Sequence, residues 1–133
     1  MRTVVIAMIL AGVTLAAPKV VVPDRNWTAT IDDNKLADQA PKNGLITDTK
    51  TFEKLWKSWR KEEKVPVVDF SKQFVLVTLS RGGPNRPIIN ATLEEGTLKI
   101  TTLSTLIGGP GFGYSIALFS RDGVKKVGEH LLP

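Results

Sequence analysis

The chain has 133 residues, with 18 basic and 13 acidic side chains, a formal net charge of +5 and no cysteine. This length suits one domain, and a composition of 42% hydrophobic and 23% charged residues is typical of a globular protein rather than a disordered one. The lack of cysteine excludes disulfide scaffolds, thiolate zinc sites, iron–sulfur clusters and cysteine nucleophiles.

Residues 1–16 have the order of a secretory signal peptide. Arg2 gives a positive start, an uncharged apolar run follows, and small residues come next. Cleavage after Ala16 keeps Pro18 away from the scissile bond and leaves Ala17 as the new N-terminus. The apolar run is too short to cross a bilayer and no later run is longer, so we expect no transmembrane span. The sequence thus predicts an exported protein, periplasmic or secreted, and the lack of cysteine favours a bacterial source.

Residues 17–43 are expected to form an N-terminal segment ahead of a single domain at residues 44–133. The segment contains early prolines and one candidate strand from Trp27 to Ile31. The stretch from Asp32 to Asn43 is polar and includes a proline, which is typical of a loop.

The clearest predicted element is a helix from about Thr49 to Glu63. Its apolar residues recur with the helical period and share one face, at Phe52, Leu55, Trp56 and Trp59. Asp48 is a suitable N-cap, because its carboxylate can accept hydrogen bonds from amides of the first turn. Pro66 prevents the helix from continuing much further. This pattern predicts a helix that anchors a hydrophobic core.

Several runs rich in β-branched and aromatic residues follow the helix and predict strands at residues 74–80, 88–93, 97–103, 114–120 and 124–127. The first should lie centrally in a sheet. The turn at 94–96 and the turn at 121–123 each end in glycine, which predicts two hairpins. We therefore expect an α+β fold in which one amphipathic helix packs on a mostly antiparallel sheet of four to five strands.

This order of elements resembles a class of small exported bacterial domains. The residues that carry the resemblance lie between 52 and 77 and read Phe52-x-x-Leu55-Trp56, then Pro66-Val67-Val68-Asp69-Phe70, then Phe74-Val75-Leu76-Val77. It is similar to the C-terminal domain of an accessory subunit of a protease complex, and to small uncharacterised secreted proteins, over roughly residues 44–133. The step Gly113-Tyr114 departs from that pattern because it lies late, in a loop rich in glycine and proline. The resemblance implies an exported, non-enzymatic domain and transfers no catalytic residue.

No set of nucleophile, base and orienting group can be named in this chain. The single histidine, His130, follows Glu129, and adjacent side chains of a strand point to opposite faces. The acidic run at 32–34 lacks the spacing of a calcium loop, and Asp69 is better suited to accept backbone amides before a strand. We therefore expect no catalytic residues, no metal and no cofactor, and we interpret the protein as a non-enzyme.

Two loops rich in glycine and proline, at residues 81–87 and 105–113, are the candidate binding site. Loops held on a rigid sheet often carry binding residues, although a simple connection with solvated charge is the alternative for each loop. If the strands at 74–80 and 114–120 pair in antiparallel fashion, both loops leave the same edge of the sheet. Two arginines and two aromatic rings would then converge on an anionic group with an apolar body, namely Arg81, Arg86, Phe112 and Tyr114.

A row of lysines is predicted on the outer side of the helix, at Lys50, Lys54, Lys57, Lys61 and Lys64. Glu53 is placed to pair with Lys57 one turn later. A solvated helix face is one interpretation of this row. Binding to an anionic lipid surface or a cell-wall polymer is the other, whereas no aromatic residue accompanies the lysines and nucleic acid is not expected.

Two hypotheses follow from these patterns. The first is an exported, non-enzymatic binding or accessory module of the bacterial envelope, whose partner is another envelope protein. The alternative is a structural envelope domain that associates with anionic surfaces or polymers through the lysine row.

Overall fold

The structure is a computed structural model that describes residues 17–133, so the predicted signal peptide at 1–16 lies outside the described residues. Its elements, in chain order, are β1 (Lys19–Val21), β2 (Arg25–Ile31), the 3-10 helix η1 (Asn34–Gln39), β3 (Leu45–Ile46), α1 (Thr49–Trp59), β4 (Gln73–Arg81), β5 (Ile88–Glu94), β6 (Thr97–Leu103), β7 (Phe112–Ser120), β8 (Lys126–Val127) and β9 (His130–Leu131).

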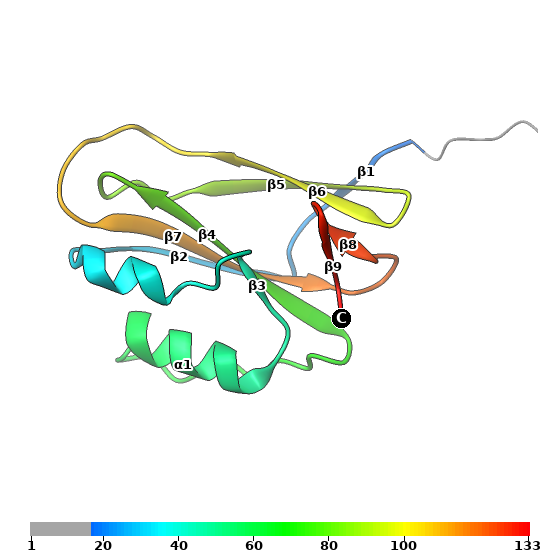
Figure 1. The fold of residues 1–133 in the computed structure, drawn as a ribbon, viewed down its shortest axis with the longest axis horizontal. Helices are drawn as coiled ribbons and strands as arrows, with labels where there is room; N and C mark the ends of the chain where they lie inside the picture. Colours follow the sequence, from blue (N-terminus) through cyan, green and yellow to red (C-terminus); the bar gives the residue numbers. More distant parts are fainter. Residues whose placement is uncertain (1–16) are drawn as a thin grey trace, which may run out of the picture.

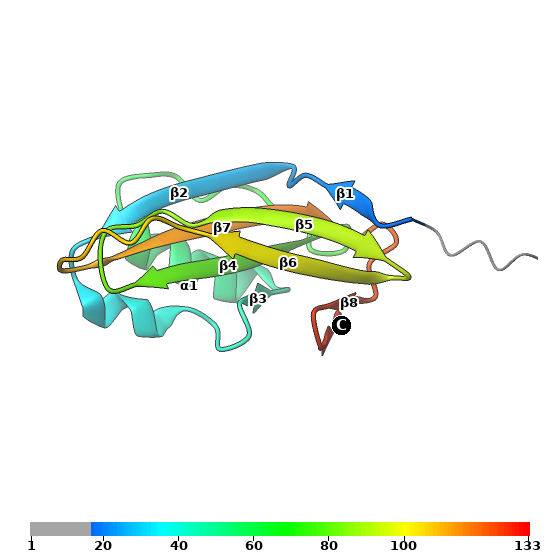
Figure 2. The same cartoon turned by 90° about the horizontal axis from the view of Figure 1, so that it is seen from above.

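These elements form three layers (Figures 1 and 2). A four-stranded sheet in the order β2-β7-β4-β3 lies in the middle, with α1 on one face and a five-stranded sheet in the order β1-β5-β6-β8-β9 on the other. All strand pairs are antiparallel except β6 with β8. The predicted α+β class is confirmed, and the strands are shared between two sheets rather than gathered in one.

Each face of the middle sheet has its own hydrophobic core, because side chains alternate along a strand. In β4, Val75 and Val77 face α1, whereas Phe74 and Leu76 face the five-stranded sheet. The core below α1 takes all four apolar residues of the helix, as its sequence period predicts: Phe52, Leu55, Trp56 and Trp59. Strand β7 is buried on both faces along almost its whole length and is therefore the centre of the molecule.

Helix α1 begins as predicted and ends earlier than predicted. Asp48 is the N-cap, and its Oδ2 accepts a hydrogen bond from the backbone N–H of Thr51 at 2.8 Å. The helix stops at Trp59, four positions before the expected Glu63. On the buried face the next positions after Trp59 are glutamates, which have no core to join, and most helical stability comes from such packing.

Three other expectations differ from the structure. The stretch expected to be a loop contains η1, because Asp33 caps it through a hydrogen bond from Lys35 N (2.9 Å) and Ala37 is buried against α1. The turn at 121–123 forms, but it starts no hairpin: the chain crosses to the five-stranded sheet, where β8 pairs in parallel with β6. Residues 17–43 supply β1 and β2, so each sheet contains a strand from the expected N-terminal segment.

The turn between β5 and β6 confirms the first predicted hairpin. Glu95 and Gly96 both have positive φ, at 50° and 81°, as a two-residue hairpin turn of the mirror-image type requires. The chain therefore returns in register along β5, with Glu94 opposite Thr97.

Candidate functional site

The two candidate loops lie together at one end of the molecule. Strands β4 and β7 pair in antiparallel fashion, with Ser80 opposite Gly113, which confirms the predicted neighbourhood of these strands. The loop that leaves β4 (82–87) and the loop that enters β7 (104–111) therefore emerge at the same edge (Figure 1). Figure 2 shows the same end from above, and there the loop at 104–111, coloured yellow to orange, extends to the left-hand end of the molecule.

Asn85 fastens the two loops to each other. Its side chain is almost fully buried and donates from Nδ2 to the carbonyl of Ile107 at 2.8 Å. Its Oδ1 accepts from the backbone N–H of Ile107 at 2.9 Å and from the hydroxyl of Thr105 at 2.7 Å. These bonds fix both backbones, because separation of the loops would leave the buried amide of Asn85 without partners.

The three hydrogen bonds of Asn85, which we call the Asn85 clasp, are accompanied by close contact between the backbones of Asn85 and Gly113. A Cβ atom placed on Gly113 would lie 1.6 Å from the carbonyl oxygen of Asn85, so only glycine fits at the start of β7. The loop at 82–87 therefore rests directly on the backbone of the central strand.

The loop at 104–111 and the strand ends beside it carry exposed aliphatic side chains, which we call the aliphatic tip and define as Ile88, Leu103, Leu106 and Ile107. Ile88 and Leu103 are cross-strand partners in the β5–β6 pair. Leu106 is 96% exposed, although its neighbour Ile107 has its backbone held on both sides by Asn85. Single exposed aliphatic residues are ordinary, but a cluster at one end of a molecule is typical of a contact surface.

The predicted convergence of two arginines and two aromatic rings does not occur. Arg81 and Arg86 are exposed as expected, and Arg81 lies 3.5 Å from Asp38. Phe112 and Tyr114 are 0% and 1% exposed, so they offer no aromatic surface to a partner. Alternation along β7 turns both rings toward α1, where Trp59 lies 5.5 Å and 4.7 Å from them.

All five residues of the predicted lysine row are exposed, and three of them lie on α1: Lys50, Lys54 and Lys57. Lys61 and Lys64 follow the end of the helix and so fall outside the helical spacing. Among the ion pairs of residues 17–133, none includes a lysine of this row, and the expected pair of Glu53 with Lys57 is absent. Lys50 and Lys54 border a cleft of about 530 Å³ between α1 and the chain around Asp38.

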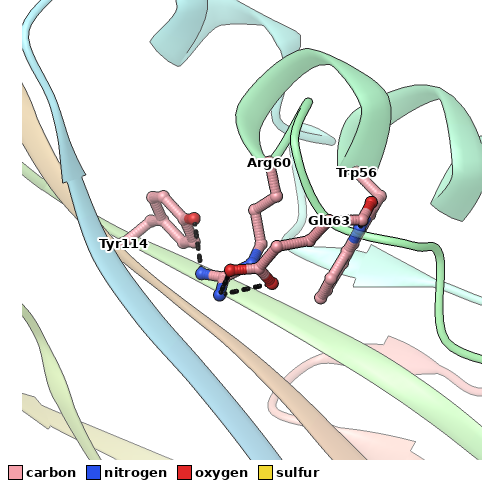
Figure 3. A network of polar contacts seen from close by, with 4 residues as sticks. All are labelled: Trp56, Arg60, Glu63 and Tyr114. Atoms are coloured by element: carbon pink, nitrogen blue, oxygen red, sulfur yellow. Dashed lines mark hydrogen bonds and ion pairs between the residues drawn. The ribbon is translucent and has the colours of Figure 1, made fainter.

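A second cleft, of about 470 Å³, lies at the C-terminal end of α1. Arg60 stands beside it, directly after the helix, and its Nη1 donates to the hydroxyl of Tyr114 at 3.0 Å. Nη2 donates to both carboxylate oxygens of Glu63, at 2.7 and 2.8 Å, and Nε donates to Oε2 at 2.9 Å (Figure 3). The guanidinium carbon also lies 5.1 Å from the centre of the Trp56 ring.

Two opposing effects act on the charge of Arg60. Partial burial is the largest influence and lowers the pKa of Arg60, but hydrogen bonds to Glu63 and Tyr114 outweigh it and leave the pKa above its ordinary value. Arg60 is therefore a permanent cation that is held between an aromatic ring, a phenol and a carboxylate.

The remaining candidate residues have local roles. His130 is exposed in β9. Asp69 accepts from the backbone N–H and the hydroxyl of Ser71, and these bonds, the hydroxyl first, hold the pKa of Asp69 below its usual value. In residues 17–133 no three His, Asp or Glu side chains gather in a way that suits a metal ion. Over the same range, no helix has the length and apolar character needed to span a membrane.

Asn85 and Arg60 were not among the residues that the sequence indicated. Asn85 stands between glycine and proline residues, a context that indicates only a turn, and its partner lies 22 positions away. Arg60 had a local signal, because Trp56 precedes it by one helical turn and Glu63 follows it by three positions.

Comparisons with protein-family models, with characterised proteins and with solved structures find no match to this chain. The resemblance to a domain of a protease accessory subunit therefore stays a prediction.

Proposed function

We propose that the protein is an exported, non-enzymatic binding or accessory module of the bacterial envelope, and that the aliphatic tip is its contact surface for another envelope protein. The observation that carries this proposal is the clasp of Asn85, which holds exposed aliphatic side chains on a fixed backbone. A loop that is already fixed loses little conformational entropy when a partner binds. Burial of its apolar side chains therefore contributes more to the affinity than burial of the same side chains on a flexible loop would.

A photo-cross-linking residue in place of Leu106 tests this function in the native envelope. The matched control is the same residue in place of Val67, which is 95% exposed but lies in the chain between α1 and β4. We expect one defined envelope protein to be labelled from position 106 and not from position 67, and we expect Ile107→Asp to abolish that labelling. Equal labelling from both positions, or none from position 106, contradicts the proposed surface.

Export is tested separately by N-terminal sequencing of the protein recovered from the envelope. We expect Ala17 as the first residue, since the signal-peptide pattern places the cleavage site after Ala16. Recovery of protein that still begins with Met1 contradicts export by this route.

A second candidate function rests on the lysine row. Its lysines are exposed and take part in no ion pair within residues 17–133, so their charge is available to an anionic envelope polymer or lipid surface. Sedimentation with anionic vesicles at low and at high salt tests this function. Replacement of the five lysines by glutamine should remove salt-sensitive binding without affecting cross-linking from position 106.

A further inference from the structure

The cleft at the C-terminal end of α1 is open to solvent and has both apolar and charged residues in its lining. Its volume of about 470 Å³ lies within the usual range of ligand sites. Its lining combines the apolar residues Ile31, Leu36 and Trp59 with the charged residues Arg60 and Glu63. It is separate from the aliphatic tip, since none of the tip residues lines it.

The cation in this cleft has partners besides its carboxylate. The Arg60 guanidinium lies near the ring of Trp56 and donates from Nη1 to the hydroxyl of Tyr114 (Figure 3). Its Nε and Nη2 bind Glu63, whose side chain is 53% exposed against 15% for Arg60. A ligand can therefore reach the carboxylate of Glu63 from solvent, and Arg60 keeps its contacts with Trp56 and Tyr114 when that carboxylate turns away.

The backbone at Glu63 is also fixed independently of its side chain. Its N–H donates to the carbonyl of Arg60 at 3.0 Å, and its carbonyl accepts from Nε1 of Trp56 at 3.1 Å. Removal of the Glu63 carboxylate therefore exposes the outer edge of the guanidinium and leaves the end of the helix intact.

We infer that this cleft binds a small ligand that carries a carboxylate and an apolar body, and that the ligand carboxylate replaces Glu63 on Arg60. The planar guanidinium presents two parallel N–H donors, which match the two oxygens of a carboxylate. The apolar body of the ligand would lie against Leu36 and Trp59. Glu63 thus acts as an internal substitute for the ligand.

Titration of the full chain with two carboxylates tests both parts of this ligand. N-acetylphenylalanine carries a carboxylate and an apolar ring, as the carboxyl end of a peptide does, whereas methyl glucuronide carries its carboxylate on a polar sugar. The amide of N-acetylphenylalanine is the control that lacks the charge. NMR of the Nε–H of Arg60 and the Nε1–H of Trp59 reports binding at the cleft itself. We expect N-acetylphenylalanine to shift both signals, methyl glucuronide to shift them less, and the amide to shift neither.

Variants decide whether the ligand competes with Glu63. Glu63→Ala should tighten binding of the acid by about threefold, because the ligand no longer has to displace the Glu63 carboxylate from Arg60. Glu62→Ala is the matched control, since it removes the same charge from the same cleft, and within residues 17–133 the carboxylate that binds Arg60 is that of Glu63. Arg60→Lys should weaken binding about tenfold, because a lysine lacks the paired donors.

The inference is overturned if neither acid shifts the Arg60 signal at millimolar concentration. It is also overturned if Glu62→Ala tightens binding as much as Glu63→Ala, which shows that only the general charge of the surface matters. Since Glu63→Ala keeps both backbone bonds of residue 63, its result stands even if Arg60→Lys fails to fold.

Discussion

The side-chain amide of Asn85 pairs with the backbone of Ile107 through two hydrogen bonds, although 22 positions separate the two residues. The amide copies the donor and acceptor of a peptide group, so it acts like one residue of a neighbouring strand. This pairing joins the loop that follows β4 to the loop that precedes β7, and both loops lead from one sheet to the other. The aliphatic tip thereby becomes part of the folded framework rather than a separate flexible loop.

Replacing Asn85 with alanine should lower the free energy of unfolding by about 1–3 kcal/mol, because the variant loses three hydrogen bonds that the buried amide makes to the second loop. Amide hydrogen exchange at Ile107 should accelerate, since its N–H loses its acceptor. Asn90→Ala is the control, because Asn90 is exposed on β5. Unchanged exchange at Ile107 in the Asn85 variant contradicts the clasp.

Two glycine-to-alanine changes measure the cost of a steric contact at positions where the backbone conformation itself allows alanine. Gly113 and Gly108 both lack a positive φ, so alanine suits the backbone at either position. A Cβ at Gly113 meets the carbonyl of Asn85 at 1.6 Å, whereas a Cβ at Gly108 meets nothing within 4 Å. We expect Gly113→Ala to cost about 3 kcal/mol or more and Gly108→Ala to change stability by less than about 0.5 kcal/mol. Denaturant midpoints measure both, and similar values contradict the contact.

Phe112→Ala and Arg86→Ala should differ strongly in stability, although their positions both lie in the region expected to be loops. Phe112 is fully buried beside Trp59, so its truncation should cost about 3–5 kcal/mol. Arg86 is exposed, and its replacement should change stability by less than about 0.5 kcal/mol. Chemical denaturation of the two single variants measures this, and a neutral Phe112→Ala would place the ring in solvent.

Local patterns account for what the sequence predicted correctly. The period of Phe52, Leu55, Trp56 and Trp59 defined the buried face of α1, and the acidic residue before it defined the cap. The nearly continuous apolar runs located β4 and β7, because a strand between two layers must be apolar on both faces. None of these inferences needed a distant residue.

The sequence could not show how the strands divide between two sheets. The turn at 121–123 looks the same whether the chain returns along β7 or crosses to β6. After the crossing, Val127 of β8 is buried in the core between the two sheets and pairs with a strand, β6, that lies far from the turn in sequence. Similarly, Tyr114 stands beside a glycine-rich loop in sequence, and only the register of β7 turns it toward α1. The predicted binding site was wrong at Tyr114 because the pairing of β7 with its neighbouring strands depends on contacts between residues far apart in the sequence.

The positions of residues around α1 predict an order of stability among three alanine variants. Trp56 is buried and meets Trp27 edge-on at 5.1 Å, so Trp56→Ala should cost about 3–5 kcal/mol. Trp59→Ala should cost a similar amount and should also leave the carbonyl of Leu36 without its donor. Lys57 is exposed between them, and Lys57→Ala should cost less than about 0.5 kcal/mol. Unfolding midpoints for the three variants test the order.

The cap of α1 should make stability depend on acid pH in a defined direction. A hydrogen bond from the backbone N–H of Thr51, followed by one from its side chain, holds the pKa of Asp48 below its usual value. The folded state thus favours the ionised carboxylate, and its contribution is complete above a pH of about 4 and is lost as the pH falls through the lowered pKa.

The comparison of the parent protein with Asp48→Asn isolates this effect, because asparagine keeps a capping oxygen and does not titrate. At neutral pH the parent should be more stable by about 0.5 kcal/mol, the contribution of a negative charge at the start of a helix. That difference should decline toward zero between about pH 4 and pH 2, and other carboxylates such as Asp69 cancel because both proteins contain them. Urea unfolding across this range measures it. If the difference stays constant with pH, the Asp48 carboxylate does not cap α1 in its ionised form.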